Sequence, residues 1–376
     1  MIPFNRATIA PKQLDFVGET FASAHLAGDG PFTRRASSVL QTIHGGDCTV
    51  LLTTSCTAAL ELSALLLDLQ PGDEVIVPSF TFVSSANAFA VMGARIVFVD
   101  VEKDTLNLSV EHVEAAMGPR TRAIVPVNYG GVPAVTKELL DLARDHDVMV
   151  IEDNAHGLFG RDDSGPLGSR SPLSTLSFHE TKNVTCGEGG ALVINDPELV
   201  ERAEILREKG TNRSRFFRGM VDKYTWIDVG SSYLLSDINA AVLCSQLDHR
   251  EAIQARRRSA ATRDRTELAG WADENGATML HRKPASDLPD HLFPLLLPDL
   301  DARTRMLTYT RDHGVATTFH YIPLHDSPAG QRLGHAPLGC PVATDVSERL
   351  IRLPLFSDIS DAEITSIIEV VQGFET

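Results

Sequence analysis

Between residues 49 and 153 the chain alternates short aliphatic runs with longer segments of helical pattern. The runs predict buried strands at residues 49–53, 74–78, 95–100, 123–127 and 148–153. The segments between them predict helices at residues 55–69, 83–92, 110–117 and 136–146. Strands that are apolar throughout and separated by helices indicate a mostly parallel sheet with helices on both faces. The expected fold class is therefore α/β.

The rest of the chain predicts a second, smaller domain. A helix at residues 236–247 ends the large domain, and a charged helix over residues 250–265 connects it to shorter elements. Helices are expected at residues 300–313 and 362–373. We therefore predict a large domain over residues 1–248 and a small α+β domain over residues 249–376. Residues 1–45 are expected to form an irregular arm, with a loop at residues 28–35.

Composition disfavours several classes of function. The formal net charge of −16 argues against a nucleic-acid binder, because no basic face is evident at that balance. The five cysteines show no Cys-x-x-Cys spacing, which favours a reducing cytoplasm and disfavours a zinc site. The N-terminus lacks the apolar core of a signal peptide, and no apolar run reaches the ~18 residues that span a bilayer. We expect a cytoplasmic protein without a membrane partner.

Lys182 follows a predicted strand end and precedes the glycine-rich residues 187–190. A lysine in such a place can stand in a cleft, where burial shifts its pKa and prepares the amine to react with an aldehyde. A surface lysine in a loop is the ordinary alternative. The other polar stretches of the chain favour the reactive interpretation.

Residues 53–60, which include Ser55, Cys56 and Thr57, join a strand to a helix through hydroxyl-bearing and small side chains. Free N–H groups at such a helix N-terminus bind phosphate, although simple capping by Ser55 explains the pattern equally well. The stretch lacks the Gly-Lys-Ser/Thr of a nucleotide-binding loop. No Gly-x-Gly-x-x-Gly follows the first strands, which argues against a nicotinamide dehydrogenase.

Asp153 and His156 lie at the carboxyl end of an apolar strand, the edge at which open α/β sheets bind ligands. A buried acid there needs a cationic partner such as a protonated pyridine nitrogen, and His156 could reach a phenolic oxygen of the same ring. Phe82, just past another strand, could lie flat on that ring. Taken singly, these residues are equally explained as a turn cap, a buried histidine and a core aromatic. Together with Lys182 and the phosphate-binding turn, they predict pyridoxal 5′-phosphate as cofactor.

Over nearly its whole length the sequence resembles the fold-type I aminotransferases that act on nucleotide-linked keto sugars, above all the dTDP-4-amino-4,6-dideoxygalactose transaminase type. The segments that carry the resemblance are residues 178–183 (FHETKN), 208–214 (EKGTNRS), 221–226 (VDKYTW) and 320–325 (HYIPLH). The resemblance implies that Lys182 is joined covalently to the cofactor aldehyde and moves a proton to the sugar. It further implies that Asp153 holds the pyridine nitrogen, His156 contacts the ring oxygen and Phe82 stacks on the ring.

The resemblance also implies sites for the remaining groups. Cys56, Thr57 and Ser177 would bind the cofactor phosphate, and Asn183, Arg213, His320 and Tyr321 would line the sugar-nucleotide side. Many family members have glycine at the position of Cys56, whose N–H can still donate. Many have asparagine at the position of Ser232, where it crosses a dimer interface to the partner's phosphate. The resemblance implies a homodimer, with the arm from Asn5 to Arg35 reaching the neighbouring site.

The expected activity is transfer of an amino group from L-glutamate to C4 of dTDP-4-keto-6-deoxyglucose, giving a gluco- or galacto-configured amino sugar. Three alternatives are open: amination at C3, a sugar 3-dehydratase, and a cofactor-binding regulator without turnover. Lys182 speaks against the dehydratase, because those enzymes carry histidine at that position. The excess of arginine over lysine tilts the expected pathway toward a natural product rather than a surface polysaccharide.

Overall fold

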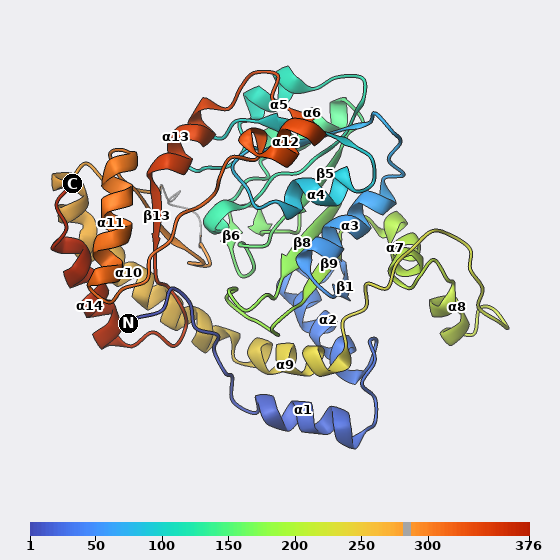
Figure 1. Cartoon of the computed structure of the whole chain (residues 1–376). Helices are drawn as coiled ribbons and strands as arrows, with labels where there is room; N and C mark the ends of the chain where they lie inside the picture. Colours follow the sequence, from blue (N-terminus) through green and yellow to red (C-terminus); the bar gives the residue numbers. More distant parts are fainter. Residues whose placement is uncertain (281–286) are drawn as a thin grey trace.

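The computed structural model describes residues 1–280 and 287–376, and a single large sheet organises them. The strand order is β1-β9-β8-β5-β4-β2-β3-β12. β9 is antiparallel to both of its neighbours, and the other pairs are parallel. The expected α/β fold is thus confirmed (Figure 1). The strands are β1 (Thr49–Thr53), β2 (Glu74–Pro78), β3 (Arg95–Val99), β4 (Thr121–Ile124), β5 (Met149–Asp153), β8 (Leu173–Ser177), β9 (Gly190–Ile194) and β12 (Gly334–His335).

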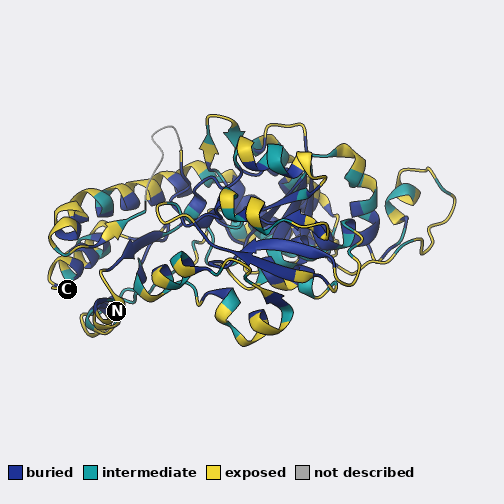
Figure 2. Ribbon diagram, turned by 90° about the horizontal axis from the view of Figure 1, so that it is seen from above, coloured by how far each residue is buried: buried dark blue, intermediate teal, exposed yellow. Residues whose placement is uncertain are grey.

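Helices cover both faces of this sheet, because successive side chains of each strand point to opposite sides. On β2, Val75 and Val77 pack against the layer of α3, α4 and α7, whereas Ile76 packs against α5 and α6. The far half of the second face is covered by α2 and α9. Figure 2 shows the buried strands between helices whose outer sides are exposed. The bounds are α2 (Pro31–Ile43), α3 (Cys56–Leu66), α4 (Ser84–Ala90), α5 (Val110–Ala116), α6 (Lys137–Asp145), α7 (Val200–Arg207) and α9 (Asp237–Asp248).

A second hydrophobic core lies in the C-terminal part of the chain, around the three-stranded sheet β10-β11-β13. The helices α10, α11 and α14 pack on it (Figure 1). The predicted helices are present, and α10 runs nine residues past its predicted end at residue 265. The bounds are α10 (Arg250–Glu274), α11 (Leu300–Asp312), α14 (Asp361–Gln372), β10 (Thr278–Met279), β11 (Phe293–Leu296) and β13 (Leu350–Leu353).

Between these elements the chain returns to the large sheet. α12 (Pro328–Leu333) leads into β12, which pairs with β3, and α13 (Pro341–Arg349) packs on the same core through Ala343 and Val346. The domain boundary at residues 248/249 stays a prediction, and residues 281–286 of the predicted small domain lie outside the described residues. The remaining short elements are β6 (Arg161–Asp162), β7 (Gly165–Pro166), α8 (Arg213–Phe217) and three 3₁₀ turns at Tyr129–Gly131, Pro197–Leu199 and Leu324–Asp326.

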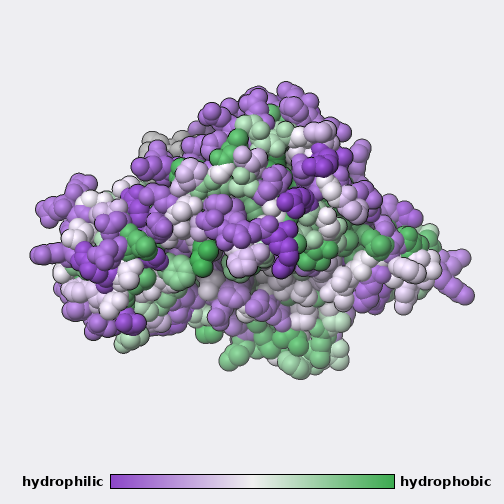
Figure 3. Space-filling model, turned by 45° about the horizontal axis from the view of Figure 1, so that its top comes forward, coloured by the Kyte–Doolittle hydropathy of each residue, from purple (hydrophilic) through white to green (hydrophobic). Residues whose placement is uncertain are grey.

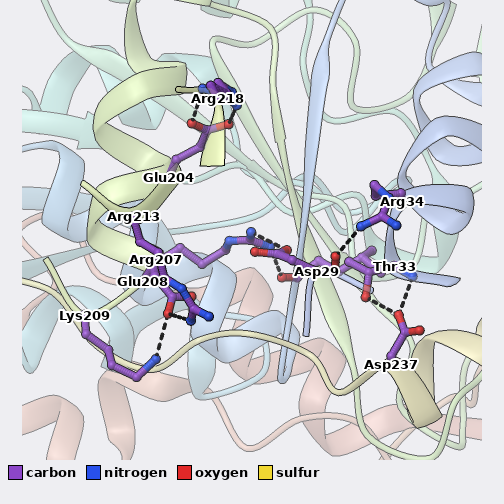
Figure 4. A network of polar contacts seen from close by, with 11 residues as sticks. Asp29, Thr33, Arg34, Glu204, Arg207, Glu208, Lys209, Arg213, Arg218 and Asp237 are labelled. Atoms are coloured by element: carbon purple, nitrogen blue, oxygen red, sulfur yellow. Dashed lines mark hydrogen bonds and ion pairs between the residues drawn. The ribbon is translucent and has the colours of Figure 1, made fainter. Parts of the chain in front are cut away.

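The predicted irregular arm is wrong, because residues 1–45 contain two helices, α1 (Gln13–Ala22) and α2. The expected loop at residues 28–35 gives way to α2 at Pro31, a residue that suits the first turn of a helix. The N-terminus of α2 is capped from another element, since Asp237 accepts hydrogen bonds of 2.8 Å from both the amide and the hydroxyl of Thr33 (Figure 4). This cap lies 204 residues away in sequence, so no local pattern announces it.

The longest helix carries a buried acid. Asp264 of α10 is 2% exposed, and one of its carboxylate oxygens has no hydrogen-bond partner in the described part of the chain. Burial raises the pKa of this carboxyl group to about 7. None of the helices in residues 1–280 and 287–376 is both long and apolar enough to cross a membrane.

Asp264 makes stability depend on pH. Unfolded aspartate titrates near pH 4, so between about pH 4 and pH 7 the folded state retains a proton that the unfolded state has released. Stability should therefore fall as the pH rises through this interval and level off above pH 7. Asp264→Asn should stabilise the protein more at pH 8 than at pH 5. The two gains in free energy of unfolding should differ by an amount on the order of 2–4 kcal/mol. Thermal unfolding at both pH values measures it. Asp273→Asn, at an exposed position of the same helix, is the control, and equal pH dependence of the two variants would contradict the prediction.

Candidate active site

A cavity of about 600 Å³ lies at the carboxyl ends of the parallel strands. It is lined by side chains from the turns that follow β1, β2, β5 and β8, together with residues from the C-terminal part. The structure brings these predicted site residues together around it: Cys56, Thr57, Phe82, Asp153, His156, Ser177, Lys182, His320 and Tyr321. The strand-end placement inferred from the apolar runs is what makes them converge.

Lys182 stands in the turn after β8, where its N–H donates to the carbonyl of His179 at 2.9 Å. The side chain faces the cavity and is otherwise enclosed by protein atoms. Burial lowers the pKa of the amine to about 8, and the nearby charge of Asp153 opposes the shift. A substantial fraction of the amine is therefore unprotonated near neutral pH, the state that attacks an aldehyde.

Asp153 ends β5 and points into the cavity, whereas its neighbour Glu152 points to the other face. One carboxylate oxygen of Asp153 accepts a hydrogen bond of 2.7 Å from the hydroxyl of Ser85, and the other accepts from the N–H of Ala155 at 3.1 Å. Burial raises the pKa of Asp153 and these hydrogen bonds oppose the rise. No lysine or arginine of the described residues contacts this carboxylate, so it is suited to a cationic N–H group of a ligand.

The N-terminus of α3 forms another wall of the cavity. The side chain of Ser55 caps the helix by accepting from the N–H of Ala58 at 3.0 Å, and the N–H groups of Cys56 and Thr57 have no partner within the helix. The hydroxyl of Thr57 lies 2.7 Å from that of Ser84. Free amides and hydroxyls at a helix N-terminus bind an anion such as phosphate. Burial raises the pKa of the Cys56 thiol, so Cys56 contributes its amide and not a thiolate.

Uncharged polar rings also line the cavity. Burial lowers the pKa of His320 to about 2 and holds that of His156 well below its usual value, so both imidazoles are neutral. The hydroxyl of Tyr129 lies 3.1 Å from Nδ1 of His320. This buried hydroxyl has no other hydrogen-bond partner among the described residues, so it donates to Nδ1 and leaves the imidazole proton on Nε2. The His320 ring stacks on Tyr321 with centroids 3.8 Å apart.

Phe82 is 57% exposed and lines the cavity, with its ring centroid 6.3 Å from that of Tyr321. The interpretation of Phe82 as a core residue is therefore wrong. An exposed aromatic ring at a cavity offers a flat apolar face to a planar ligand.

Three predicted residues do not line this cavity. Asn183 is buried behind it, where its amide donates to the carbonyl of Pro289 at 2.7 Å and its oxygen lies 2.8 Å from Nδ1 of His291. Arg213 is exposed on α8 and pairs with Glu208 at 3.1 Å (Figure 4). Ser232 is exposed on the segment that follows α8.

Sequence reasoning missed several residues that the structure places at the cavity: Phe4, Ser84, His291 and Arg352 line it, and Ser85 holds Asp153 from behind. Ser84 and Ser85 lie in the same polar stretch as Phe82, so their position after a strand was available as a signal. Phe4, His291 and Arg352 belong to segments that reach the cavity only through tertiary packing, and no local pattern marks them.

Comparison with known proteins identifies the group to which this site belongs. Residues 8–372 match the profile of the DegT/DnrJ/EryC1/StrS aminotransferase family. The chain belongs to this family. The resemblance to sugar aminotransferases is thereby confirmed at the level of the family, and the assignment to the dTDP-galactose type stays a prediction.

Individual relatives agree with this assignment. The chain is 30% identical to the spore coat polysaccharide biosynthesis protein SpsC of Bacillus subtilis, with 99% of this chain and 96% of SpsC covered. The aminotransferase TlmJ from Streptoalloteichus hindustanus is 32% identical with a TM-score of 0.90 over 99% of this chain and 98% of TlmJ. Spr1654 from Streptococcus pneumoniae, solved in PLP and PMP forms, is 27% identical; its PMP form has a TM-score of 0.91 over 99% of this chain and 98% of its own.

The protein is thus a sugar aminotransferase, and its cofactor is pyridoxal phosphate. The residues of the cavity fit that group. Asp153 offers a buried carboxylate without a cationic neighbour in contact, and Lys182 offers an amine of lowered pKa. Close approach of β9 to the anion-binding turn requires glycine at position 190, because a Cβ there would lie 2.4 Å from the backbone nitrogen of Cys56. The role of each residue toward the cofactor remains a proposal.

The amine of Lys182 should titrate near pH 8 in the enzyme freed of cofactor. Competitive labelling with acetic anhydride over a pH series, read by peptide mass spectrometry, measures the titration against added N-acetyl-lysine, whose pKa is about 10.4. Asp153→Asn should shift the half-maximal pH of Lys182 further down, because the carboxylate charge opposes the lowering. A half-maximal pH for Lys182 near that of the free amine would show that the cavity does not desolvate it.

Proposed function

We propose that this aminotransferase moves an amino group from L-glutamate to C4 of dTDP-4-keto-6-deoxyglucose, yielding a 4-amino-4,6-dideoxyhexose for natural-product or surface-polysaccharide biosynthesis. One observation carries the proposal. A lysine of lowered pKa, a buried acid and neutral hydrogen-bonding rings line one cavity. Neutral donors and acceptors suit the hydroxyl groups of a sugar better than charged side chains would, because desolvating them costs less.

The choice of nucleotide, carbon and donor is supported by the transaminase-type segments of the sequence. Residues 178–183 contain Lys182, and residues 320–325 contain His320 and Tyr321, which line the same cavity. SpsC, a relative of this chain, is a protein of coat polysaccharide biosynthesis, which is also sugar metabolism.

Each residue then has a defined task in the proposed reaction. Bound pyridoxal phosphate supplies a ring that accepts the electrons released at the reacting carbon. Asp153 accepts a hydrogen bond from the ring nitrogen and keeps it protonated. Lys182 carries a proton between the donor carbon or C4 of the sugar and the cofactor. His320, with its proton on Nε2, donates a hydrogen bond to an oxygen of the sugar.

Incubation of the holoenzyme with L-glutamate and dTDP-4-keto-6-deoxyglucose should yield a 4-amino sugar nucleotide, identified by NMR, together with 2-oxoglutarate. Lys182→Ala should lower the rate by at least about 10²–10⁴-fold, because it removes the group that moves the proton. An amino group found at C3 of the product would replace the proposed C4 amination by C3 amination, and absence of any amino sugar would contradict the proposed pair of substrates.

We further propose that the protein acts as a homodimer. The segment from α8 to Val229 projects from the large sheet and carries exposed apolar side chains, among them Phe217 (70% exposed) and Trp226 (76% exposed) (Figures 1 and 3). Exposed apolar groups of this density are typical of an interface. Arg213 lies on this segment and Ser232 follows its end, and neither lines this chain's own cavity. In a dimer, Arg213 and Ser232 would contribute to the cavity of the partner subunit.

Light scattering should therefore give a mass of about 82 kDa, twice the 40.9 kDa of one chain. The double variant Phe217→Asp/Trp226→Asp should shift the mass toward the monomer, because it would bury charge in an apolar contact. Leu300→Asp, at a position 44% exposed on α11, is the matched control and should leave the mass unchanged. A wild-type mass of one chain would contradict the homodimer.

A further inference from the structure

Arg352 is an arginine at the cavity whose charge the protein leaves uncompensated. It lies on β13, is half-buried and lines the cavity. The one hydrogen bond of its guanidinium to a described residue runs from Nη2 to the carbonyl of Phe319 at 3.1 Å, and its Nε is buried without a partner among those residues. The guanidinium carbon lies 4.6 Å from the centroid of the Phe4 ring. No acidic side chain of the described residues pairs with it.

Another buried arginine shows how this fold satisfies a structural guanidinium. Arg257 of α10 is 2% exposed and donates to three backbone carbonyls, those of Asp290, His291 and Leu355, at 2.8–3.2 Å. These hydrogen bonds connect α10 to the backbone at residues 290–291 and 355, and this structural role explains its position. Arg352 makes a single such bond, so most of its donors are left for something that enters the cavity. Buried charges without a partner are costly, and they occur where a ligand supplies the missing charge.

The other charged groups at the cavity leave Arg352 free for an anion. Lys182 is the remaining lysine or arginine among the described lining residues, and its amine belongs to the reacting centre. Of the lining acids, Asp153 is held by Ser85, and Glu188 lies 3.7 Å from His179. The phosphate-binding turn at the start of α3 belongs to the large sheet, whereas Arg352 comes from β13 of the C-terminal part (Figure 1). The cavity therefore offers two separate places for negative charge.

We infer that the guanidinium of Arg352 binds a carboxylate group of the amino-acid donor. The planar guanidinium matches the two oxygens of a carboxylate, and its Nη1 makes no hydrogen bond to a described residue. This role rests on the proposed function, in which the amino donor is an amino acid. Arg352 is then the residue that selects this class of donor.

The surroundings of Arg352 favour a small carboxylate over the diphosphate of a sugar nucleotide. Arg352 lines the same cavity as Lys182, His156 and His291, and its charge adds to the effect of burial in lowering the pKa of each of these groups. In an amino acid the carboxylate is attached to the carbon that carries the reacting nitrogen, or lies a few bonds from it. In a nucleotide sugar the pyranose ring separates the diphosphate from C4. A cation beside the reacting amine is therefore placed for the carboxylate.

Binding of glutarate, an unreactive dicarboxylate, tests the inference without turnover. Isothermal titration of the holoenzyme should show that Arg352→Gln weakens glutarate binding by about ten- to hundred-fold, the usual loss for a charged hydrogen bond. Arg352→Lys, which retains the charge without the fork, should lose less. Arg303→Gln is the matched control, because its guanidinium lies over the ring of Phe319, 5.8 Å from the centroid, but does not line the cavity.

The two half-reactions distinguish the donor from the sugar nucleotide. Followed by the absorbance of the cofactor, Arg352→Gln should raise the glutamate concentration for half-maximal rate by a similar factor. Reaction of its pyridoxamine form with the keto sugar should stay within a few-fold of wild type. Unchanged glutarate binding, or an equal loss in both half-reactions, would overturn the inference. Should Arg352→Gln fail to fold, the same comparisons apply to Arg352→Lys. A wild-type enzyme that binds glutarate through Arg352 but forms no amino sugar would refute the proposed function alone.

Discussion

The burial of the Asp153 carboxylate is the constraint on which the rest of the cavity depends. A carboxylate at the end of a covered parallel strand loses most of its hydration, so it must be held by donors and compensated by a cation. The hydroxyl of Ser85 and the N–H of Ala155 hold it, but neither carries charge. The compensation has to come from a ligand, and the amine of Lys182, whose own pKa is lowered by burial, lines the same cavity. The acid and the amine thus face one ligand site.

Much of this site could be predicted from the sequence because parallel strands place their carboxyl ends at one edge. The apolar runs that end at Thr53, Pro78 and Asp153 are recognisable by composition alone, and the polar residues after them converge by topology. The alternation of side chains along β5 even separates Asp153 from Glu152, which turns to the other face and bonds to Asn128 at 2.6 Å. The chemistry of the site therefore follows from strand ends and the side chains that come directly after them.

Other parts depend on contacts between segments far apart in the chain, and local patterns do not contain them. The helix α2 replaces an expected loop because Asp237 caps it across 204 residues. Asn183 follows Lys182 directly, yet the turn directs it away from the cavity, where its oxygen accepts a hydrogen bond from Nδ1 of His291 and so orients a ring that does line the cavity. Adjacency in sequence predicts proximity of the backbone but not the direction of a side chain in an irregular turn.

The two ends of the chain meet at the cavity, and this explains why Arg352 stays charged but unpaired. The N-terminal residues contact the segment that follows α11 through Ile2, whose N–H donates to the carbonyl of Gly314 at 2.7 Å, and Asn5 donates to the carbonyl of Glu180 at 3.2 Å. These contacts lay Phe4 over the guanidinium of Arg352. An aromatic face attracts a cation and fixes its position, but it supplies no counter-charge. The guanidinium is thereby held in place with its donors open, which is the arrangement that a binding group for an anion requires.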